Sequence, residues 1–265
     1  MNRYVRTVVL ILMAAAVLIP LSVLFLHSLG YWPYPELFPR DPSLDGISSY
    51  ISKPSLRRAL VNSVILSFLV TMGSLVLGYL PAKYIGTRRF RGRTLLRIIV
   101  MLPALTPGIC VVFGMIPVFI RMGIYRQYIS ILLGQLTFTL PYMIMTLSSV
   151  FEGFDENYER QSACLGVGAA DTFLNVTVPR IKSGIAVGCM YTFIVSWSMY
   201  LLTYELSPAG LETMITMIMP MLMADTATDM VLAATAIVFF APSFIFLVIS
   251  TQMIRSDRIN SGGGT

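Results

Sequence analysis

The sequence predicts an all-α, polytopic membrane protein with six transmembrane helices. Of its 265 residues, 56% are hydrophobic and only 12% are charged, and the mean hydropathy is +0.76. A soluble domain carries about 25% charged residues, so a soluble enzyme is excluded. Runs such as VVLILMAAAVLIPLSVLFL do not alternate apolar and polar residues, which argues against the strands of a membrane barrel. Helices therefore satisfy the backbone in the bilayer.

Six segments are long enough to span a bilayer, which takes about 20 apolar residues in a helix. They lie near residues 5–27, 60–85, 96–120, 129–149, 183–204 and 230–253. The basic start and apolar run at the N-terminus resemble a secretory signal, but FLHSLGYW has no small-x-small cleavage site. We therefore expect a retained first helix. Prolines within the third and fourth segments (Pro103, Pro107 and Pro141) predict kinks.

The loops predict the orientation of the chain and its organisation as a single permease-like domain, 1–265. Most of the 19 lysines and arginines fall in loops on the side of the two termini, and such loops stay in the cytoplasm. On the opposite side, residues 28–59 form an external loop with Trp32 and Tyr34 as interfacial anchors or contacts for an external partner. The short basic turn GTRRFRGRTLLR is expected to face lipid, and no nucleic-acid role is expected.

The cytoplasmic segment 150–183 is longer than a turn needs and is expected to fold. It contains the sequence FEGFDENYERQSACLGVGAADTFLNVTVPRIKS. We predict one short helix over 158–165, a turn at Gly166 and Gly168, and a second short helix over 169–176 that ends before Pro179. Leu165, Phe173 and Val176 would face the membrane. A folded loop of this size usually meets another protein.

This segment resembles the EAA loop of permease subunits of binding-protein-dependent ABC importers, and the whole pattern resembles their type I fold. The family places a glutamate and two alanines before a glycine, with an aliphatic residue and Leu-Pro about a dozen residues on. The matching residues here are Glu159, Leu165, Gly166, Thr172, Phe173, Val176, Val178 and Pro179. Gln161 and Ser162, preceded by Arg160, stand where the family has alanines. The resemblance covers about residues 55–253.

The resemblance implies that this loop is a coupling helix that docks on a cytoplasmic ABC ATPase dimer. The residues implied in coupling are Glu159, Leu165, Gly166, Asp171, Thr172, Phe173 and Pro179. The chain has no Walker motif, so ATP and Mg are expected on the separate ATPase and no cofactor on this chain. The other implied partners are an external substrate-binding protein and a second permease subunit, expected to form a heterodimer, in a bacterial cytoplasmic (inner) membrane.

Polar residues inside predicted spans are candidates for the substrate pathway. They are Asn62, Gln135, Ser196, Trp197, Tyr200, Tyr204 and Glu205. The other interpretation is that such hydroxyl and amide groups bond neighbouring helices or their own backbone. Glu205 either sits in water or attracts a cationic solute at the outer entrance.

The resemblance in SWSMYLLTYEL and in the loop favours permeases for polyamines, with iron(III), thiamine and aminoethylphosphonate as alternatives. A small cationic or zwitterionic solute such as a polyamine is therefore expected. An intramembrane enzyme is the rival function, but His-Glu-x-x-His, Gly-x-Ser-x-Gly and paired aspartates within spans are absent from the sequence. An ATP-independent channel or scaffold is the second rival, and it would need no coupling loop. Three scattered cysteines and one histidine predict no metal site.

Overall fold

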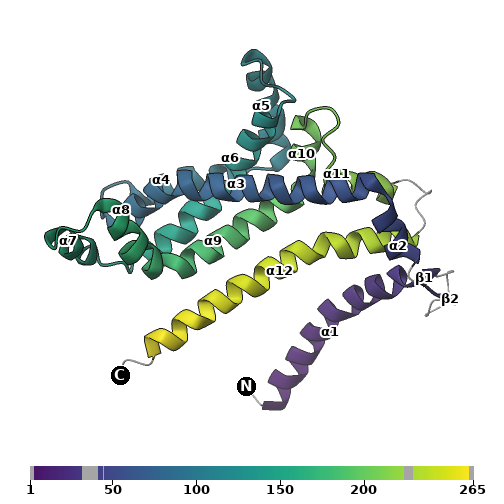
Figure 1. The fold of residues 1–265 in the computed structure, drawn as a ribbon, viewed down its shortest axis with the longest axis horizontal. Helices are drawn as coiled ribbons and strands as arrows, with labels where there is room; N and C mark the ends of the chain where they lie inside the picture. The colour runs from purple at the N-terminus through teal and green to yellow at the C-terminus, as the bar shows by residue number, and fades with distance from the viewer. Residues whose placement is uncertain (1–2, 32–40, 44, 224–228, 263–265) are drawn as a thin grey trace. The chain divides into compact units, whose positions relative to one another are not determined.

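The computed structural model describes residues 3–31, 41–43, 45–223 and 229–262. These residues are almost entirely helical (Figure 1). They divide into two compact units: Met1–Val61 with Glu212–Pro242, and Asn62–Leu211 with Ser243–Thr265. Two long helices, α3 (Pro54–Thr87) and α12 (Asp229–Gly262), continue from one unit into the other.

The first unit contains α1 and the predicted external loop. Its elements are α1 (Arg3–Ser28), β1 (Gly30–Tyr31), β2 (Asp41–Pro42), α2 (Asp45–Ser52) and α11 (Met214–Met223). β1 and β2 pair antiparallel. The buried hydroxyl of Tyr50 in α2 donates to the carbonyl of Leu56 at 3.3 Å and lies 3.6 Å from the sulfur of Met214. These contacts join α2, the start of α3 and α11. Trp32 and Tyr34 lie outside the described residues.

The second unit is built around α3, α6 (Tyr128–Phe151) and α9 (Val178–Ser198), shown in Figure 1. Glycines let these helices approach closely, as is common where membrane helices pack. A Cβ on Gly86 of α3 would lie 2.3 Å from Cβ of Phe151, and one on Gly184 of α9 would lie 2.5 Å from the side chain of Val150. Both close approaches are on α6, which is therefore the central helix of this unit.

Two predicted spans are bent pairs of helices. The third is divided into α4 (Arg93–Leu105) and α5 (Gly108–Arg121), which meet at 92°. The break is larger than the predicted kink because Thr106, which precedes Pro107, adopts an extended backbone with ψ 140°, the conformation that a following proline favours. The fifth ends earlier than expected, at Ser198, and α10 (Tyr200–Leu206) follows at 62°. Pro141 lies inside α6 without breaking it.

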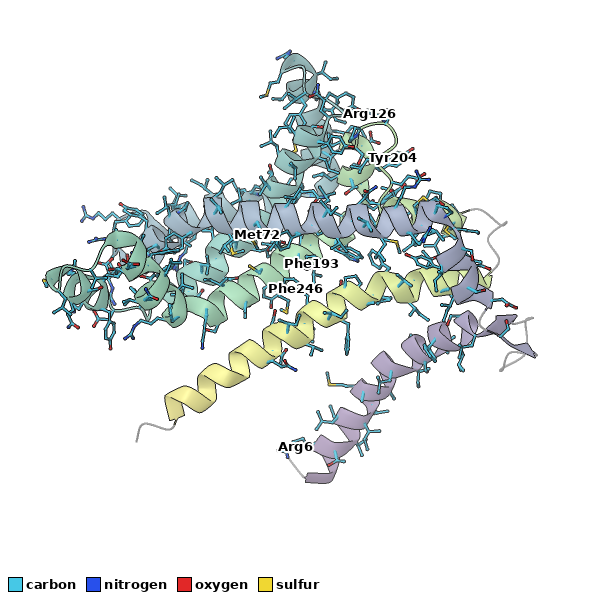
Figure 2. All side chains as sticks on the ribbon, in the orientation of Figure 1. Arg6, Met72, Arg126, Phe193, Tyr204 and Phe246 are labelled. Atoms are coloured by element: carbon cyan, nitrogen blue, oxygen red, sulfur yellow. The ribbon has the colours of Figure 1, made fainter. Side chains whose placement is uncertain are left out.

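Within the described residues, three helices are long and apolar enough to span a membrane, or five if each bent pair counts as one span. The remaining predicted span corresponds to α1, whose apolar stretch is the shorter Val5–Pro20. In the second unit, the last helix packs on α9 through Phe246 and Phe193, whose rings stack with centroids 4.7 Å apart (Figure 2). The predicted fold class, an all-helical polytopic membrane protein, is confirmed.

Candidate functional site

The segment that follows α6 is folded, as predicted, but its second half is not a separate helix. It contains α7 (Asn157–Cys164), α8 (Ala169–Thr172) and the π-helical turn η1 (Phe173–Thr177), which leads directly into α9. The prediction that the second short helix ends before Pro179 is wrong. Proline is tolerated in the first turn of a helix, and Pro179 lies at that point of α9.

Gly166 forms the turn that ends α7. Its φ is +77°, a left-handed conformation that glycine adopts without the steric cost of a Cβ. The N–H of Gly166 donates to the carbonyl of Ala163 at 3.0 Å, and that of Val167 donates to the carbonyl of Ser162 at 3.2 Å. These two bonds form a Schellman motif. They satisfy the last carbonyls of α7 and set the direction in which the chain leaves it.

Glu159 of α7 is held by two other elements. Lys83 Nζ, near the end of α3, donates to Glu159 Oε2 at 2.6 Å and to Oε1 at 2.8 Å. The hydroxyl of Thr177, at the end of η1, donates to Oε1 at 2.6 Å. The side chains of Lys83 and Glu159 are 26% and 22% exposed. Glu159 therefore connects α7 to α3 and to the start of α9.

The pKa of Glu159 reflects this environment. Burial by itself would raise the pKa of this carboxyl group. The hydrogen bonds from Lys83 and Thr177 and the positive charge of Lys83 outweigh burial and hold the pKa below its ordinary value. The carboxylate is thus ionised at neutral pH, as a strong ion pair with Lys83 requires.

The two halves of the segment also contact each other. The hydroxyls of Ser162 and Thr172, both nearly buried, share a hydrogen bond of 2.8 Å. Tyr79 of α3 meets Phe173 edge to face, with ring centroids 5.3 Å apart. A half-open pocket of about 340 Å³ lies between these groups, and it is lined by Tyr79, Lys83, Glu159, Ala163, Val167, Ala169, Thr172, Phe173 and Thr177.

The outer face of the segment has few contacts with the rest of the described chain. Leu165 is 83% exposed, and Asp171 is also exposed. Leu165 borders an open groove of about 580 Å³, whose other lining residues are Asp155, Asn157, Arg160, Gln161 and Cys164. Leu165 is thus an exposed apolar side chain at the tip of a folded loop, with mostly polar neighbours.

A second ionic cluster fastens the start of the segment. Glu152, just after α6, accepts hydrogen bonds from Arg93 at 2.7 Å and from Arg97, both in α4. The bond from Arg97 and the charges of both arginines lower the pKa of Glu152. Arg93 also donates to the carbonyl of Ile85 at 2.7 Å and to that of Gly86 at 3.2 Å. One guanidinium thus joins α4 to the end of α3 and to the segment.

Of the seven pathway candidates, two lie in a buried polar network. Gln135 is fully buried in α6, and its amide nitrogen donates to Oγ1 of Thr203 at 2.9 Å. The hydroxyl of Ser196 in α9 donates to the amide oxygen of Gln135 and lies 3.2 Å from Oγ of Ser67 in α3. These contacts join four helices, so Gln135 and Ser196 bond neighbouring helices, which is the alternative to a pathway role given in the sequence analysis.

The remaining pathway candidates differ in exposure. Trp197 is 3% exposed and its ring lies 5.7 Å from that of Phe193. Tyr200 and Tyr204 of α10 stack on each other with centroids 5.6 Å apart, and Tyr204 is 53% exposed. Glu205 and Asn62 are partly exposed. The structure therefore places Tyr200, Tyr204 and Glu205 on α10, the helix whose Thr203 accepts the hydrogen bond from Gln135.

A family model described as "Binding-protein-dependent transport system inner membrane component" matches residues 74–258, well over half of the chain. The chain belongs to this family. It is therefore a multi-pass permease of the inner membrane in a binding-protein-dependent ABC importer, and it is a transport protein, not an enzyme.

Relatives of the permease are named as transporters of different substrates. It is 26% identical over 246 residues to the trehalose transport system permease protein SugB of Mycobacterium tuberculosis, covering 88% of each chain. It is 22% identical over 217 residues to the spermidine/putrescine transport system permease protein PotC of Shigella flexneri, covering 82% of this chain and 81% of that protein.

Solved structures show the same fold. The permease matches a chain in the crystal structure of a bacterial ABC transporter involved in the import of the acidic polysaccharide alginate, with a TM-score of 0.73 and 16% identity. The match covers 95% of this chain and 98% of that chain. A second match, with a TM-score of 0.62 and 14% identity over 96% of this chain and 94% of the other, is to the alginate transporter in complex with a pentasaccharide-bound periplasmic protein.

Sequence reasoning did not identify Lys83, Arg93 and Arg97 as the residues of α3 and α4 that pair with glutamates of the folded segment. From the sequence, Lys83 is only a positive charge that sets the orientation, and Arg93 and Arg97 are expected to lie in a turn that faces lipid, whereas in the structure both pair with Glu152. Lys83 is separated from Glu159 by 76 residues, so no local pattern connects them. The available signal was the unusual number of acidic residues at the start of the segment, which require positive partners when they are partly buried.

Proposed function

We propose that this permease is one half of a pair, and that segment 150–183 docks on a cytoplasmic ABC ATPase dimer carrying ATP and Mg. An external binding protein would deliver the solute. ATP-driven closure of the ATPases would push the segment and change the access of the bundle from one side of the membrane to the other. The second half is expected to be a different permease chain, giving a heterodimer.

One observation carries this proposal: hydrogen bonds and an ion pair hold the segment in a defined shape, while its outer face is exposed. Glu159, Ser162 and Gly166 each hold it in a defined shape through the contacts described above. Leu165, at its tip, is 83% exposed. A rigid body with an exposed apolar tip can both bind a partner and transmit its displacement.

The distribution of charge supports a cytoplasmic position for the segment and for both termini. Lys83, Arg88, Arg93 and Arg97 lie at the end of the second unit where the segment is attached, and all four form ion pairs with its glutamates. Positive residues near membrane helices favour the cytoplasmic side.

The docking proposal is tested with Leu165→Glu in the full complex with its ATPase. We expect ATPase copurification to fall by at least about tenfold, because a charge replaces an apolar contact at the centre of the interface. Gly166→Val should act in the same direction, since its φ of +77° is strained for any residue with a Cβ.

Gly168→Ala is the matched control. Gly168 lies two residues away with a φ of −62°, and a Cβ there would make only ordinary contact with Asp171 at 3.8 Å. It should bind the ATPase like the wild type. Unchanged assembly and unchanged substrate-stimulated ATP hydrolysis in both Leu165→Glu and Gly166→Val would refute the coupling assignment.

For the substrate we propose a polyamine or a similar small cationic or zwitterionic solute. Support comes from the similarity to PotC, and the carboxylate of Glu205 on α10 suits a cation. A thermal-shift screen of the cognate binding protein should show stabilisation by spermidine or putrescine. Stabilisation by trehalose, iron(III), thiamine or aminoethylphosphonate instead would replace this assignment.

A further inference from the structure

We propose that Lys83, Glu159 and Thr177 form an ionic joint through which α7 and the adjoining end of α3 move as one body during transport. The inference rests on the proposed function, because it assumes that an ATPase displaces α7. It goes further by assigning Lys83 as a positioning residue and by giving Glu159 a role inside the permease.

The geometry of the joint is that of a clamp. Both oxygens of Glu159 face Lys83, at 2.6 and 2.8 Å, and one of them also accepts the Thr177 hydrogen bond at 2.6 Å. Bonds of this length between charged partners are among the stronger hydrogen bonds in proteins. The three residues come from α3, α7 and η1, so a single carboxylate fixes three elements.

Comparison with neighbouring ion pairs distinguishes this pair from ordinary surface charges. Arg88 and Arg160 approach Glu156 at 3.6 and 3.4 Å, and their side chains are 60% and 68% exposed. Exposed ion pairs of that kind contribute little to the stability of the fold. Lys83 and Glu159 are closer together and only about one quarter exposed, so solvent screens them less.

The orientation of Glu159 indicates a positioning role instead of a docking role. Its carboxylate is engaged by Lys83 and Thr177 on the side of the bundle, and the groove beside Leu165 does not include it. A positive group on the ATPase would have to compete with Lys83. The outer face of α7 therefore serves docking, while Glu159 connects α7 to α3.

The last turn of α3, which follows Lys83, is tightly packed against α6 and bonded to α4. Gly86 lies three residues further along α3 and leaves no space for a Cβ against Phe151 of α6. Arg93 bonds the carbonyls of Ile85 and Gly86 to α4. Displacement of α7 would thus reach α3 through the joint, and α4 and α6 through the last turn of α3.

A reversible covalent joint tests this inference in the full transporter complex. Cys110, Cys164 and Cys189 are first replaced by serine, and Lys83→Cys and Glu159→Cys are then introduced together and bridged with a short bis-methanethiosulfonate reagent. Because the two cysteines take the place of the ion pair, the unbridged protein lacks the joint and the bridged protein restores it covalently. If the joint connects α7 to α3, the vanadate-trapped complex forms to the wild-type extent only in the bridged protein; equal trapping with and without the bridge would overturn the joint.

Activity provides the second measurement. We expect the Lys83→Gln and Glu159→Gln variants to copurify with the ATPase. The stimulation of their ATP hydrolysis by the binding protein should be about threefold to fivefold weaker than in the wild type. The bridged double-cysteine protein should regain it, and dithiothreitol should remove it again. A purely structural role would lower the amount of complex and leave stimulation per complex unchanged, which would also overturn the joint.

Two further variants guard against simple misfolding. Arg89→Gln removes one positive charge near Lys83 from an exposed residue and should behave like the wild type. Thr177→Val removes only the hydroxyl and should give a partial loss; full stimulation in Thr177→Val together with full stimulation in Lys83→Gln would exclude the joint. Binding of the ATPase to the wild-type permease is measured before any variant. If the wild-type permease binds no ATPase, the proposed function itself is rejected.

Discussion

Ser162 and Thr172 share a buried hydrogen bond of 2.8 Å across the turn that joins α7 to α8. Ser162 stands where the EAA pattern has an alanine. The departure therefore does not loosen the segment, because the added hydroxyl has its partner within the same loop. It replaces close packing of a methyl group by a polar contact between the two halves of the segment.

This relationship predicts an asymmetric response to mutation. Ser162→Ala alone should destabilise the segment by about 1 kcal/mol, because it leaves the nearly buried Thr172 hydroxyl without its partner. The double variant Ser162→Ala with Thr172→Val should recover most of that loss. Hydrogen exchange of the α7 amides in the intact complex measures both effects. Equal protection in the single and double variants would contradict the prediction.

Much of this segment could be predicted from the sequence because its signals are local. Gly166 indicates a left-handed turn wherever a short helix precedes it, and the structure has that turn. The continuous helix from α8 into α9 could not be predicted, since a proline such as Pro179 ends one helix and begins another equally well. Glu159 and its partner Lys83 are distant in the sequence, and only the fold brings them together.

The spans show the same division between local and tertiary information. Apolar length locates the helices because the thickness of the bilayer requires it. The sharp turn at Thr106 and Pro107 was predicted only as a kink; the extended backbone of Thr106 follows locally from the proline after it, but the angle of 92° between the two halves depends on what each half packs against. Gln135 was a pathway candidate on polarity alone, and its burial among four helices is a property of the packed bundle.

The close approach of α3 and α6 predicts that Gly86 tolerates no side chain. Gly86→Ala would place a Cβ 2.3 Å from Phe151 Cβ and 2.7 Å from the carbonyl oxygen of Ser148. Neither group is the end of a flexible side chain, so we expect a loss of about 1–3 kcal/mol from overpacking. Thermal unfolding of the purified permease in detergent measures it.

Gly114 of α5 provides the control for this effect. A Cβ there meets nothing within 4 Å, and alanine favours a helix over glycine by about 1 kcal/mol. Gly114→Ala should therefore leave the unfolding temperature unchanged or raise it. A similar fall for both variants would show that the contact with Phe151 is not the cause.

The lowered pKa of Glu159 predicts how the segment responds to acid. Because its pKa in the folded protein lies below the ordinary value of 4.5, the ion pair with Lys83 stabilises the fold at pH values above that ordinary value. This stability is lost as the pH falls through the folded-state pKa. Hydrogen exchange of α7, corrected for intrinsic rates, should accelerate as the pH falls below the ordinary value of 4.5 and through the folded-state pKa.

Comparison with Glu159→Gln separates this group from other carboxylates. The glutamine variant cannot titrate at this position, so its α7 should be less protected at pH 6 and show a smaller further change on acidification. Glu152 also has a lowered pKa and contributes to the response of both proteins. Identical pH profiles for the wild type and the variant would show that the charge of Glu159 does not stabilise the segment.

The buried network around Gln135 predicts that this residue stabilises the permease and does not select its solute. Gln135→Met keeps the length of the side chain but removes the bonds to Thr203 and Ser196, and such contacts between membrane helices are worth about 0.6–1.7 kcal/mol. We expect a lower unfolding temperature with unchanged discrimination among solutes in competition uptake assays. Thr137→Val is the control, because the Thr137 hydroxyl donates to the carbonyl of Leu133 within its own helix. If Gln135→Met instead altered discrimination at an unchanged unfolding temperature, Gln135 would belong to the pathway, and the helices around it would have to separate enough to admit solute.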